Sequence, residues 1–286
     1  MKKAIFQAYE RPFPLDAYGV NSNIAAKAQL SHTFVVCDDD RRYNWNCWGD
    51  GEEAVDQSDV KPLGNYKGEG YAAWVSLLYG SKEGERNPTD KVMGLRIRVD
   101  GVCQNASNRI LALSGRDMSV SEAPANAAVL LMYGKFGFGI ESFIQDVRSA
   151  AEQINQKENS SILAEEIEAV IATLCAGADD EMGIIGGECL GTHFHSVIAN
   201  NVLPEKLATL KGIYKTFQIR RAEIYNNNSK VGLDGVVFQK EFAKQLSVAF
   251  INCLVEMKGI LSPDEYKDLF PDEPETLASL LLPSIT

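Results

Sequence analysis

The chain has 286 residues, of which 45% are hydrophobic and 23% are charged. This composition is typical of a folded protein, and the length is sufficient for one large domain or two ordinary ones with a substantial core. The formal net charge of −11 argues against broad binding to nucleic acids or anionic membranes, because both require clustered lysine and arginine side chains.

The start of the chain and its cysteines bear on the cellular compartment. The apolar run after Lys2 and Lys3 is too short for a secretory signal peptide, and no stretch approaches the roughly 20 apolar residues of a membrane span. The six cysteines are scattered without a CxxC pair, which favours reduced thiols over a disulfide framework. We therefore expect a cytoplasmic protein, or an effector exported without a cleavable signal.

The first fifty residues contain one clear element, a β-hairpin. The stretch from His32 to Asp38 is rich in Val and Phe and predicts a buried strand. A charged turn follows, and Tyr43 to Trp48 predicts the return strand. Residues 1–30 show no clear pattern beyond a short helix over 23–29. Cys37 and Cys47 stand inside the two strands, where we expect a structural role.

Between this hairpin and Cys103 the pattern predicts loops, one helix and one strand. Glycine and aspartate predict a loop over 49–67, and 71–78 predicts a short helix that ends at Gly80. Residues 93–99 alternate apolar and basic side chains, which predicts a half-exposed strand.

The chain after Cys103 is predicted to be largely helical. Apolar residues at helical spacing predict helices over 106–113, 125–132, 140–156, 162–174 and 238–257. The last of these stripes we assign to a helix core, although it could instead face a partner helix. Ser262 to Glu265 combines an N-cap, a proline at the first helical position and a capping glutamate, so another helix begins there. Asn226 to Asn228 predicts a loop.

Three residues predict a nucleophile, a base and an orienting amide. Cys103 opens a predicted helix, and a helix N-terminus or a nearby imidazolium favours the reactive thiolate. His32 starts one hairpin strand and Asn46 lies on the other, from which a carboxamide oxygen can hold the ring N–H. Asn44 or Asp50 could serve in place of Asn46. The polar helix opening supports a site there, because it is unlike the start of a buried apolar helix: Gln104, Asn105, Ser107 and Asn108.

These residues resemble the papain-like cysteine peptidases. His32-Thr33-Phe34-Val35-Val36 with Asn46-Cys47-Trp48-Gly49 is similar to that family's histidine strand and its Asn-Ser-Trp-Gly segment, and Gly101-Val102-Cys103 is similar to its nucleophile motif. The resemblance implies that Cys103 attacks the carbonyl, His32 transfers the proton, Asn46 orients His32 and Trp48 covers their contact.

The order of the motifs departs from papain. Here His32 precedes Cys103, which resembles the circularly permuted members of the wider papain and NlpC/P60 fold group. The match covers roughly residues 32–110. No family glutamine precedes Cys103, so the backbone N–H of Cys103 is the oxyanion donor that the match supplies. We assign Trp48 and Gln104 to substrate contact.

Three further motifs have plainer explanations. Cys189, His193 and His195 could bind a metal ion only if their segment is an irregular loop, and we predict a structural or substrate-contact loop, with no metal and no cofactor. The glycine-rich stretch 134–139 lacks phosphate-loop spacing and predicts a hinge or a close-packed turn. The carboxylates at 165, 166 and 168 suit the first turns of a helix better than a paired-carboxylate site.

The sequence therefore predicts an α+β cysteine hydrolase of permuted papain-like fold. Residues 1–120 would form the catalytic core, with its antiparallel sheet, and 121–286 a helical region packed on it. Cys103 would attack an amide bond of a protein or peptide. Water as the acceptor makes a peptidase, amidase or deamidase, and an amine makes a transglutaminase-type transferase; some permuted relatives instead transfer lipid acyl groups. The alternative is a non-enzymatic interaction protein whose helical region carries the function.

Overall fold

The computed structural model describes thirteen segments of the chain, which fall into two compact units. The described residues are 1–12, 31–38, 42–43, 60–79, 93–96, 99–115, 131–159, 162–186, 198, 202–230, 235–270, 273–275 and 278. The first unit, here called the sheet unit, comprises Met1–Phe13, Ser31–Ala125 and Lys135–Ala178. The second, here called the helical unit, comprises Pro14–Leu30, Asn126–Gly134 and Asp179–Thr286.

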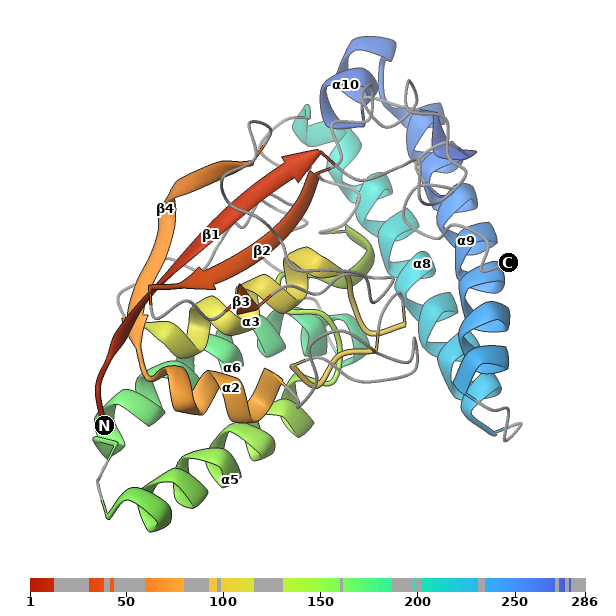
Figure 1. The fold of residues 1–286 in the computed structure, drawn as a ribbon. Helices are drawn as coiled ribbons and strands as arrows, with labels where there is room; N and C mark the ends of the chain where they lie inside the picture. Colours follow the sequence, from red (N-terminus) through yellow and green to blue (C-terminus); the bar gives the residue numbers. More distant parts are fainter. Residues whose placement is uncertain are drawn as a thin grey trace. The chain divides into compact units, whose positions relative to one another are not determined.

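The sheet unit contains a four-stranded antiparallel sheet in the order β3-β2-β1-β4 (Figure 1). Its strands are β1 (Ala4–Pro12), β2 (Ser31–Cys37), β3 (Arg42–Tyr43) and β4 (Lys61–Gly70). The register pairs Pro12 with Ser31 at one end of the sheet, and Ala4 with Gly70 at the other. Ser31 and Gly70 therefore lie at opposite ends of the sheet.

The predicted hairpin is confirmed in its described part. Strand β2 begins next to His32, and Tyr43 of β3 pairs with Val35. Strand β1 was not predicted. The loop predicted over 49–67 is wrong from residue 61 onward, because that stretch forms β4. A glycine-rich stretch of low strand propensity is extended here because β1 supplies its hydrogen-bonding partner, with a register shift between Gln7 and Tyr9.

Four helices among the described residues contribute to the sheet unit and confirm the predicted positions. They are α2 (Ala72–Tyr79), α3 (Cys103–Ser114), α5 (Ile140–Glu158) and α6 (Ala164–Gly186), whose last residues belong to the helical unit. Helix α3 contacts β1, β2 and β4 on one side and α2 on another, and α2 packs on α5. Every residue of α3 is buried, so this helix is the centre of the unit.

The boundary between the units differs from the predicted one at residue 120. Residues 135–178 belong to the sheet unit, because α5 and the first part of α6 share one hydrophobic core with the sheet. Val147 and Leu174 are buried in that core together with Phe6 of β1. At the coarse level the fold is α+β, with a small antiparallel sheet and a majority of helix.

The strand predicted over 93–99 is wrong, because a turn occupies its described part. Met93 and Gly94 both have positive φ angles, of 51° and 74°, which an extended strand does not allow. The Arg96 side chain then binds Asp100, with Nε 2.7 Å from Oδ2, and the Asp100 N–H donates to the Arg96 carbonyl. The described residues of this stretch are therefore a turn at Met93 and Gly94 and the ion pair of Arg96 with Asp100.

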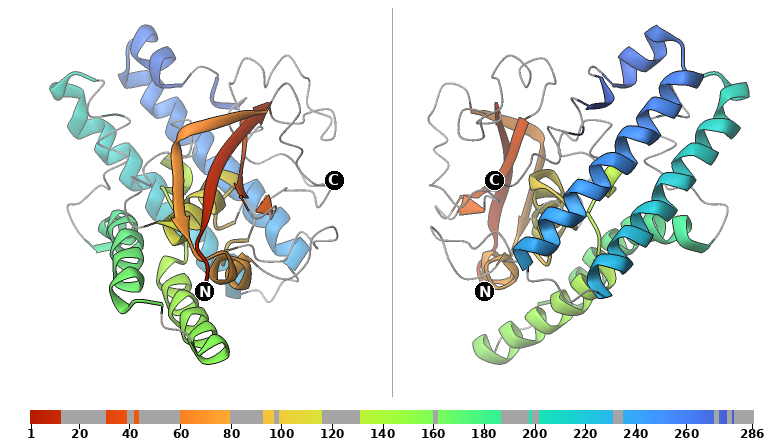
Figure 2. Two further views of the ribbon diagram at one scale, coloured as in Figure 1. Left: turned by 60° about the vertical axis from the view of Figure 1, so that its left-hand side comes forward. Right: turned by 90° about the vertical axis from the view of Figure 1, so that its right-hand side faces the viewer.

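The helical unit is described mainly by three helices, α8 (Pro204–Lys230), α9 (Gly235–Ile260) and α10 (Pro263–Leu269). Helices α8 and α9 lie side by side along their length (Figure 2). The α9 stripe predicted to be core is buried: Phe238, Phe242, Leu246, Phe250, Cys253, Leu254 and Met257. No helix among the described residues is long and apolar enough to cross a membrane.

Two local predictions in this unit have opposite outcomes. The loop predicted at Asn226 to Asn228 is wrong: these residues extend α8, where Asn228 is buried and its amide donates to the Ile224 carbonyl at 2.8 Å. The predicted start of α10 is confirmed. Glu265 accepts the Ser262 N–H at 2.7 Å, and the Ser262 hydroxyl accepts the Glu265 N–H at 3.3 Å.

The first testable prediction concerns acid stability at this cap. The hydrogen bond from Lys206, followed by the Ser262 backbone, lowers the pKa of Glu265 from 4.5 to about 2. The folded-state pKa lies below the unfolded one, so the stabilisation is present above pH 4.5 and is lost as the pH falls toward 2. Lys206→Met should raise the Glu265 pKa, measured by a carboxyl NMR titration.

The same variant should lose less stability than the parent between about pH 5 and about pH 3 in urea unfolding. Arg148→Met is the matched control, because Arg148 forms an exposed ion pair with Glu168 in the sheet unit, away from α10. A Glu265 pKa unchanged by Lys206→Met contradicts the assignment of Lys206 as its main partner.

Candidate functional site

Cys103 is the first residue of α3, as predicted, and its side chain is buried. The preceding residue, Val102, is extended, and its N–H donates to Asn105 Oδ1 at 2.9 Å. This bond fixes the first turn of the helix. The sulfur therefore stands at the helix end where the backbone N–H groups and the macrodipole are most positive.

His32 is the second residue of β2 and is also buried. Its ring is stacked on Phe34, with centroids 6.0 Å apart, and Phe34 is stacked in turn on Tyr9 of β1. Because Phe34 is two residues further along the strand, both rings stand on the same face of the sheet. The imidazole is thus positioned by a short aromatic row across β2 and β1.

Helix α3 runs along the sheet with its cysteine end toward the histidine end of β2. The Ser107 hydroxyl, one turn after Cys103, donates to the Thr33 carbonyl at 3.2 Å. At the other helix end Ser114 lies against Gly70, where an added Cβ would come within 2.5 Å of the Ser114 Cα. Gly70 belongs to the sheet end opposite Ser31, so the first turn of α3 lies toward the end of the sheet at which β2 begins. Val35 and Cys37 face the core that contains α3, and His32 and Phe34 alternate with them, so the His32 ring stands on the other face of the sheet.

Gln104 holds the sulfur of Cys103. The Cys103 Sγ lies 3.0 Å from Gln104 Oε1, so the thiol donates a hydrogen bond to the amide. Gln104 is itself buried. The substrate contact predicted for Gln104 is therefore, in this structure, a contact with the candidate nucleophile.

The other predicted site residues lie outside the described part of the chain. They are Asn46 and Trp48 of the hairpin, and Cys189, His193 and His195 of the possible metal loop. Within the described residues, no group of three or more His, Cys, Asp or Glu side chains could hold a metal ion.

The polar opening of α3 has a structural explanation that the sequence did not reveal. Asn105 and Asn108 both donate side-chain hydrogen bonds to the Lys135 carbonyl, at 3.2 and 2.8 Å. Arg109 is fully buried and donates to the carbonyls of Met93, Phe136 and Phe138 at 2.7–2.8 Å. The polar residues thus clamp the helix to two turns of the backbone, and their presence is no independent sign of a site.

The glycine-rich stretch confirms the predicted close-packed turn. Gly137 has a φ of +70°, and an added Cβ would lie 2.4 Å from the Asp100 carbonyl oxygen. The next residue, Phe138, donates its N–H to that same oxygen at 2.7 Å. The turn therefore anchors the segment that enters α3, three residues before Cys103.

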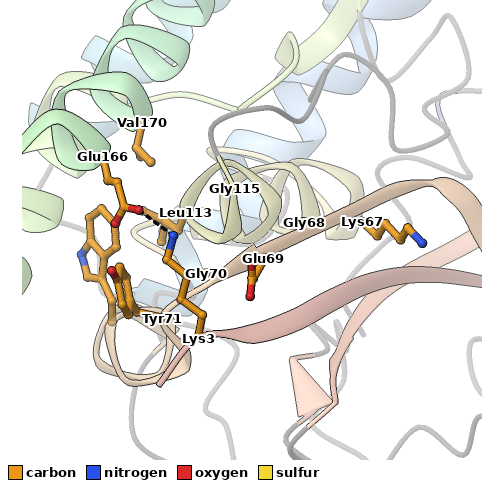
Figure 3. A pocket seen from close by; sticks show the side chains of 11 residues that line it. Lys3, Lys67, Gly68, Glu69, Gly70, Tyr71, Leu113, Gly115, Glu166 and Val170 are labelled. Carbon is orange, nitrogen blue, oxygen red and sulfur yellow. Dashed lines mark hydrogen bonds and ion pairs between the residues drawn. The ribbon is translucent and has the colours of Figure 1, made fainter. Parts of the chain in front are cut away.

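A pocket of about 360 Å³ opens elsewhere in the sheet unit (Figure 3). Lys3 and Glu166 form an ion pair of 2.5 Å beside Tyr71. The hydrogen bond that Lys3 donates to Glu166 raises the pKa of Lys3, and burial followed by a hydrogen bond with Glu166 raises the pKa of Tyr71. Neither Cys103 nor His32 lines this pocket. Sequence reasoning placed Glu166 in a first helical turn, but no motif marked Lys3 or Tyr71.

Comparison with known proteins adds no family to this description. No protein-family model, curated protein or solved structure matches the chain. The papain-like resemblance therefore depends on the short motifs around His32 and Cys103.

The second prediction tests the clamp on α3. Arg109→Met leaves three buried carbonyls without their donor, and each unmet group costs about 1–3 kcal/mol. The free energy of unfolding, measured with urea, should fall by at least about 3 kcal/mol. Arg148→Met is the matched control, because Arg148 forms an exposed ion pair with Glu168, worth about 0–1 kcal/mol. Equal losses in the two variants refute the clamp.

The third prediction compares two glycines of one turn. Gly137 and Gly139 have nearly the same φ, +70° and +75°, but an added Cβ meets the Asp100 carbonyl at Gly137 and nothing within 4 Å at Gly139. Gly137→Ala should therefore lose about 1–3 kcal/mol more stability than Gly139→Ala, because only the first is overpacked. Thermal unfolding of both variants measures the difference, and equal melting temperatures would contradict the close approach.

Proposed function

We propose that this protein is a cysteine-dependent hydrolase of amide bonds, with Cys103 as nucleophile and His32 as general base. The supporting observation is the position of Cys103 at the N-terminus of α3, whose next turn binds the Thr33 carbonyl through Ser107, one residue after His32. A helix N-terminus favours the reactive thiolate of a cysteine, and an imidazole brought beside the sulfur would favour it further. The permuted papain-like resemblance gives the same roles to both residues.

The proposed reaction has two steps, the formation of a thioester on Cys103 and its hydrolysis by water. His32 takes the Cys103 proton, the sulfur attacks the amide carbon, and the Cys103 backbone N–H donates to the oxyanion. The C–N bond breaks, and His32 protonates the departing amine, which leaves a thioester. Water then attacks the thioester with His32 as base, the C–S bond breaks, and the carboxylic acid and the free thiol are released. Asn46 would orient His32 and Trp48 would cover their contact.

Burial defines what must move for this reaction. Cys103 and His32 are each only 3% exposed, so the proposed site would have to open to admit a substrate. Helix α3 is fixed by its clamp, whereas the Gln104 amide that binds the thiol is a side chain with freedom to rotate. In the proposed mechanism the thiol exchanges its hydrogen bond with Gln104 for one with His32, which also requires the start of β2 to rearrange, because the ring stands on the sheet face opposite α3.

The substrate proposed is a protein or a peptide, with water as acceptor. The catalytic set alone would also transfer the acyl group to an amine, as in a transglutaminase-type transferase. A screen of proteins and peptides against a Cys103→Ala trap identifies bound substrates. Incubation of these substrates with the parent protein, with and without an added primary amine, separates the two reactions. An amine adduct on the substrate in place of a new carboxylate would assign the transferase reaction.

The fourth prediction tests the activation of Cys103. Iodoacetamide labelling from about pH 5 to about pH 9, read by mass spectrometry, should modify Cys103 near neutrality and faster than any other buried cysteine. Cys253 is the matched control: it is similarly buried, and burial raises its pKa to about 12. It should stay unmodified throughout this range. Labelling of Cys103 that is as slow as that of Cys253 refutes the proposal.

A variant of His32 separates its chemistry from its packing. His32→Phe keeps an aromatic ring on Phe34 but removes both nitrogens, so the fold should persist while fast labelling of Cys103 is lost. Cys37→Ser, a change in the same strand, should leave the Cys103 rate unchanged. Fast labelling retained in a folded His32→Phe variant would show that His32 is not the base.

A further inference from the structure

The outward face of α9 carries exposed apolar residues opposite its buried stripe. Val248 is 57% exposed and Val255 is 49% exposed, and the two are seven residues apart on one face of the helix. Gln245 and Asn252 are exposed between and beside them. The two valines lie on one helix face beside a groove, which makes this face a candidate for contact with another surface.

A groove beside these residues runs between α8 and α9. It has a volume of about 460 Å³, and Phe217, Ala249 and Cys253 contribute apolar side chains to it. Val248 and Ile213 line it from the two helices. A groove between two antiparallel helices has the form that accepts a ridge of side chains from a third helix.

The charges along this face have opposite signs at its two ends. Lys244, Val248, Asn252 and Glu256 follow one another at intervals of four residues and all line the groove, so they form one ridge of α9. The basic end also has Arg220 of α8, since Phe217 contacts Phe250 and α8 runs opposite to α9. Arg220 shares its charge with Glu223 at 3.0 Å.

We propose that this α8–α9 face binds the same face of a second copy of the chain, around a two-fold axis near position 250 of α9. Lys244 and Glu256 lie at equal distances on either side of that position. A two-fold axis there places Lys244 of one copy beside Glu256 of the other, twice, with the two Val248 side chains near the axis. A two-fold interface must be complementary to itself, and a ridge with one cation and one anion at its ends meets that requirement.

The charge pattern favours a second copy over an unrelated helix. The chain as a whole has a net charge of −11, so two copies repel each other except where local charges are complementary. The ridge ends supply that complementarity, and the valines supply the apolar contact at its centre. This inference does not depend on the proposed hydrolase activity.

The fifth prediction tests the interface by sedimentation velocity of the full chain over a range of concentrations. The parent should show a concentration-dependent monomer–dimer equilibrium. Lys244→Glu and Glu256→Lys should each raise the dissociation constant at least about tenfold, because symmetry turns two attractive contacts into two repulsive ones. The double variant Lys244→Glu/Glu256→Lys should restore the parent value, because the swapped charges again face each other.

Two further variants control for burial and folding. Val248→Lys should abolish the dimer, whereas Leu163→Lys, at an equally exposed position (57%) of the sheet unit, should leave it unchanged. A parent that stays monomeric at all concentrations overturns the proposal, and so does a double variant as weak as either single one. Reduced urea stability of Val248→Lys without a change in mass would show that this face packs within its own chain, which also overturns it.

Discussion

The guanidinium of Arg109 is the interaction on which the sheet unit depends. A buried cation is tolerated only when its donors are used, and here they bind three backbone carbonyls while the group stacks on Phe143 at 4.5 Å. The carbonyls belong to the turn at Met93 and to the turn over 135–139. One side chain thus joins α3 to two turns that have little regular structure of their own, and to the helix α5 that follows them.

Side chains also donate hydrogen bonds to backbone carbonyls on the other side of Gly134, in the helical unit. The carbonyls of Leu131 and Met132 end a short helical stretch, and Tyr214, Gln218 and Arg221 of α8 donate hydrogen bonds to them. These three residues lie on one face of α8. The chain therefore passes from the helical unit to the sheet unit at a point where each side is anchored separately, through side chains that satisfy backbone carbonyls. A glycine-rich stretch between them needs no helix or strand to hold its place.

Sequence patterns predicted those elements whose own residues specify them. The apolar stripe of α9, the capping residues of α10 and the valine-rich strand at His32 are local signals, and each is confirmed. Strand β4 and the turn at Met93 are different, because β4 is extended by pairing with β1 and the turn is held by Asp100 and Arg109. In the candidate site, the helix start at Cys103 and the strand at His32 could be predicted for the same reason, whereas the contact of Gln104 with the sulfur depends on packing.

The clamp on α3 also bears on the proposed chemistry. Catalysis by a cysteine and a histidine on different elements requires that those elements hold their separation to a fraction of an ångström. Here Arg109, Asn105 and Asn108 fix the helix from one side, and Ser107 fixes it to β2 from the other. With both backbones held, the remaining freedom near the sulfur belongs to side chains, Gln104 first among them. A proton transfer from Cys103 to His32 would need a rotation of that amide and also a change at the start of β2, because the His32 ring stands on the sheet face opposite α3.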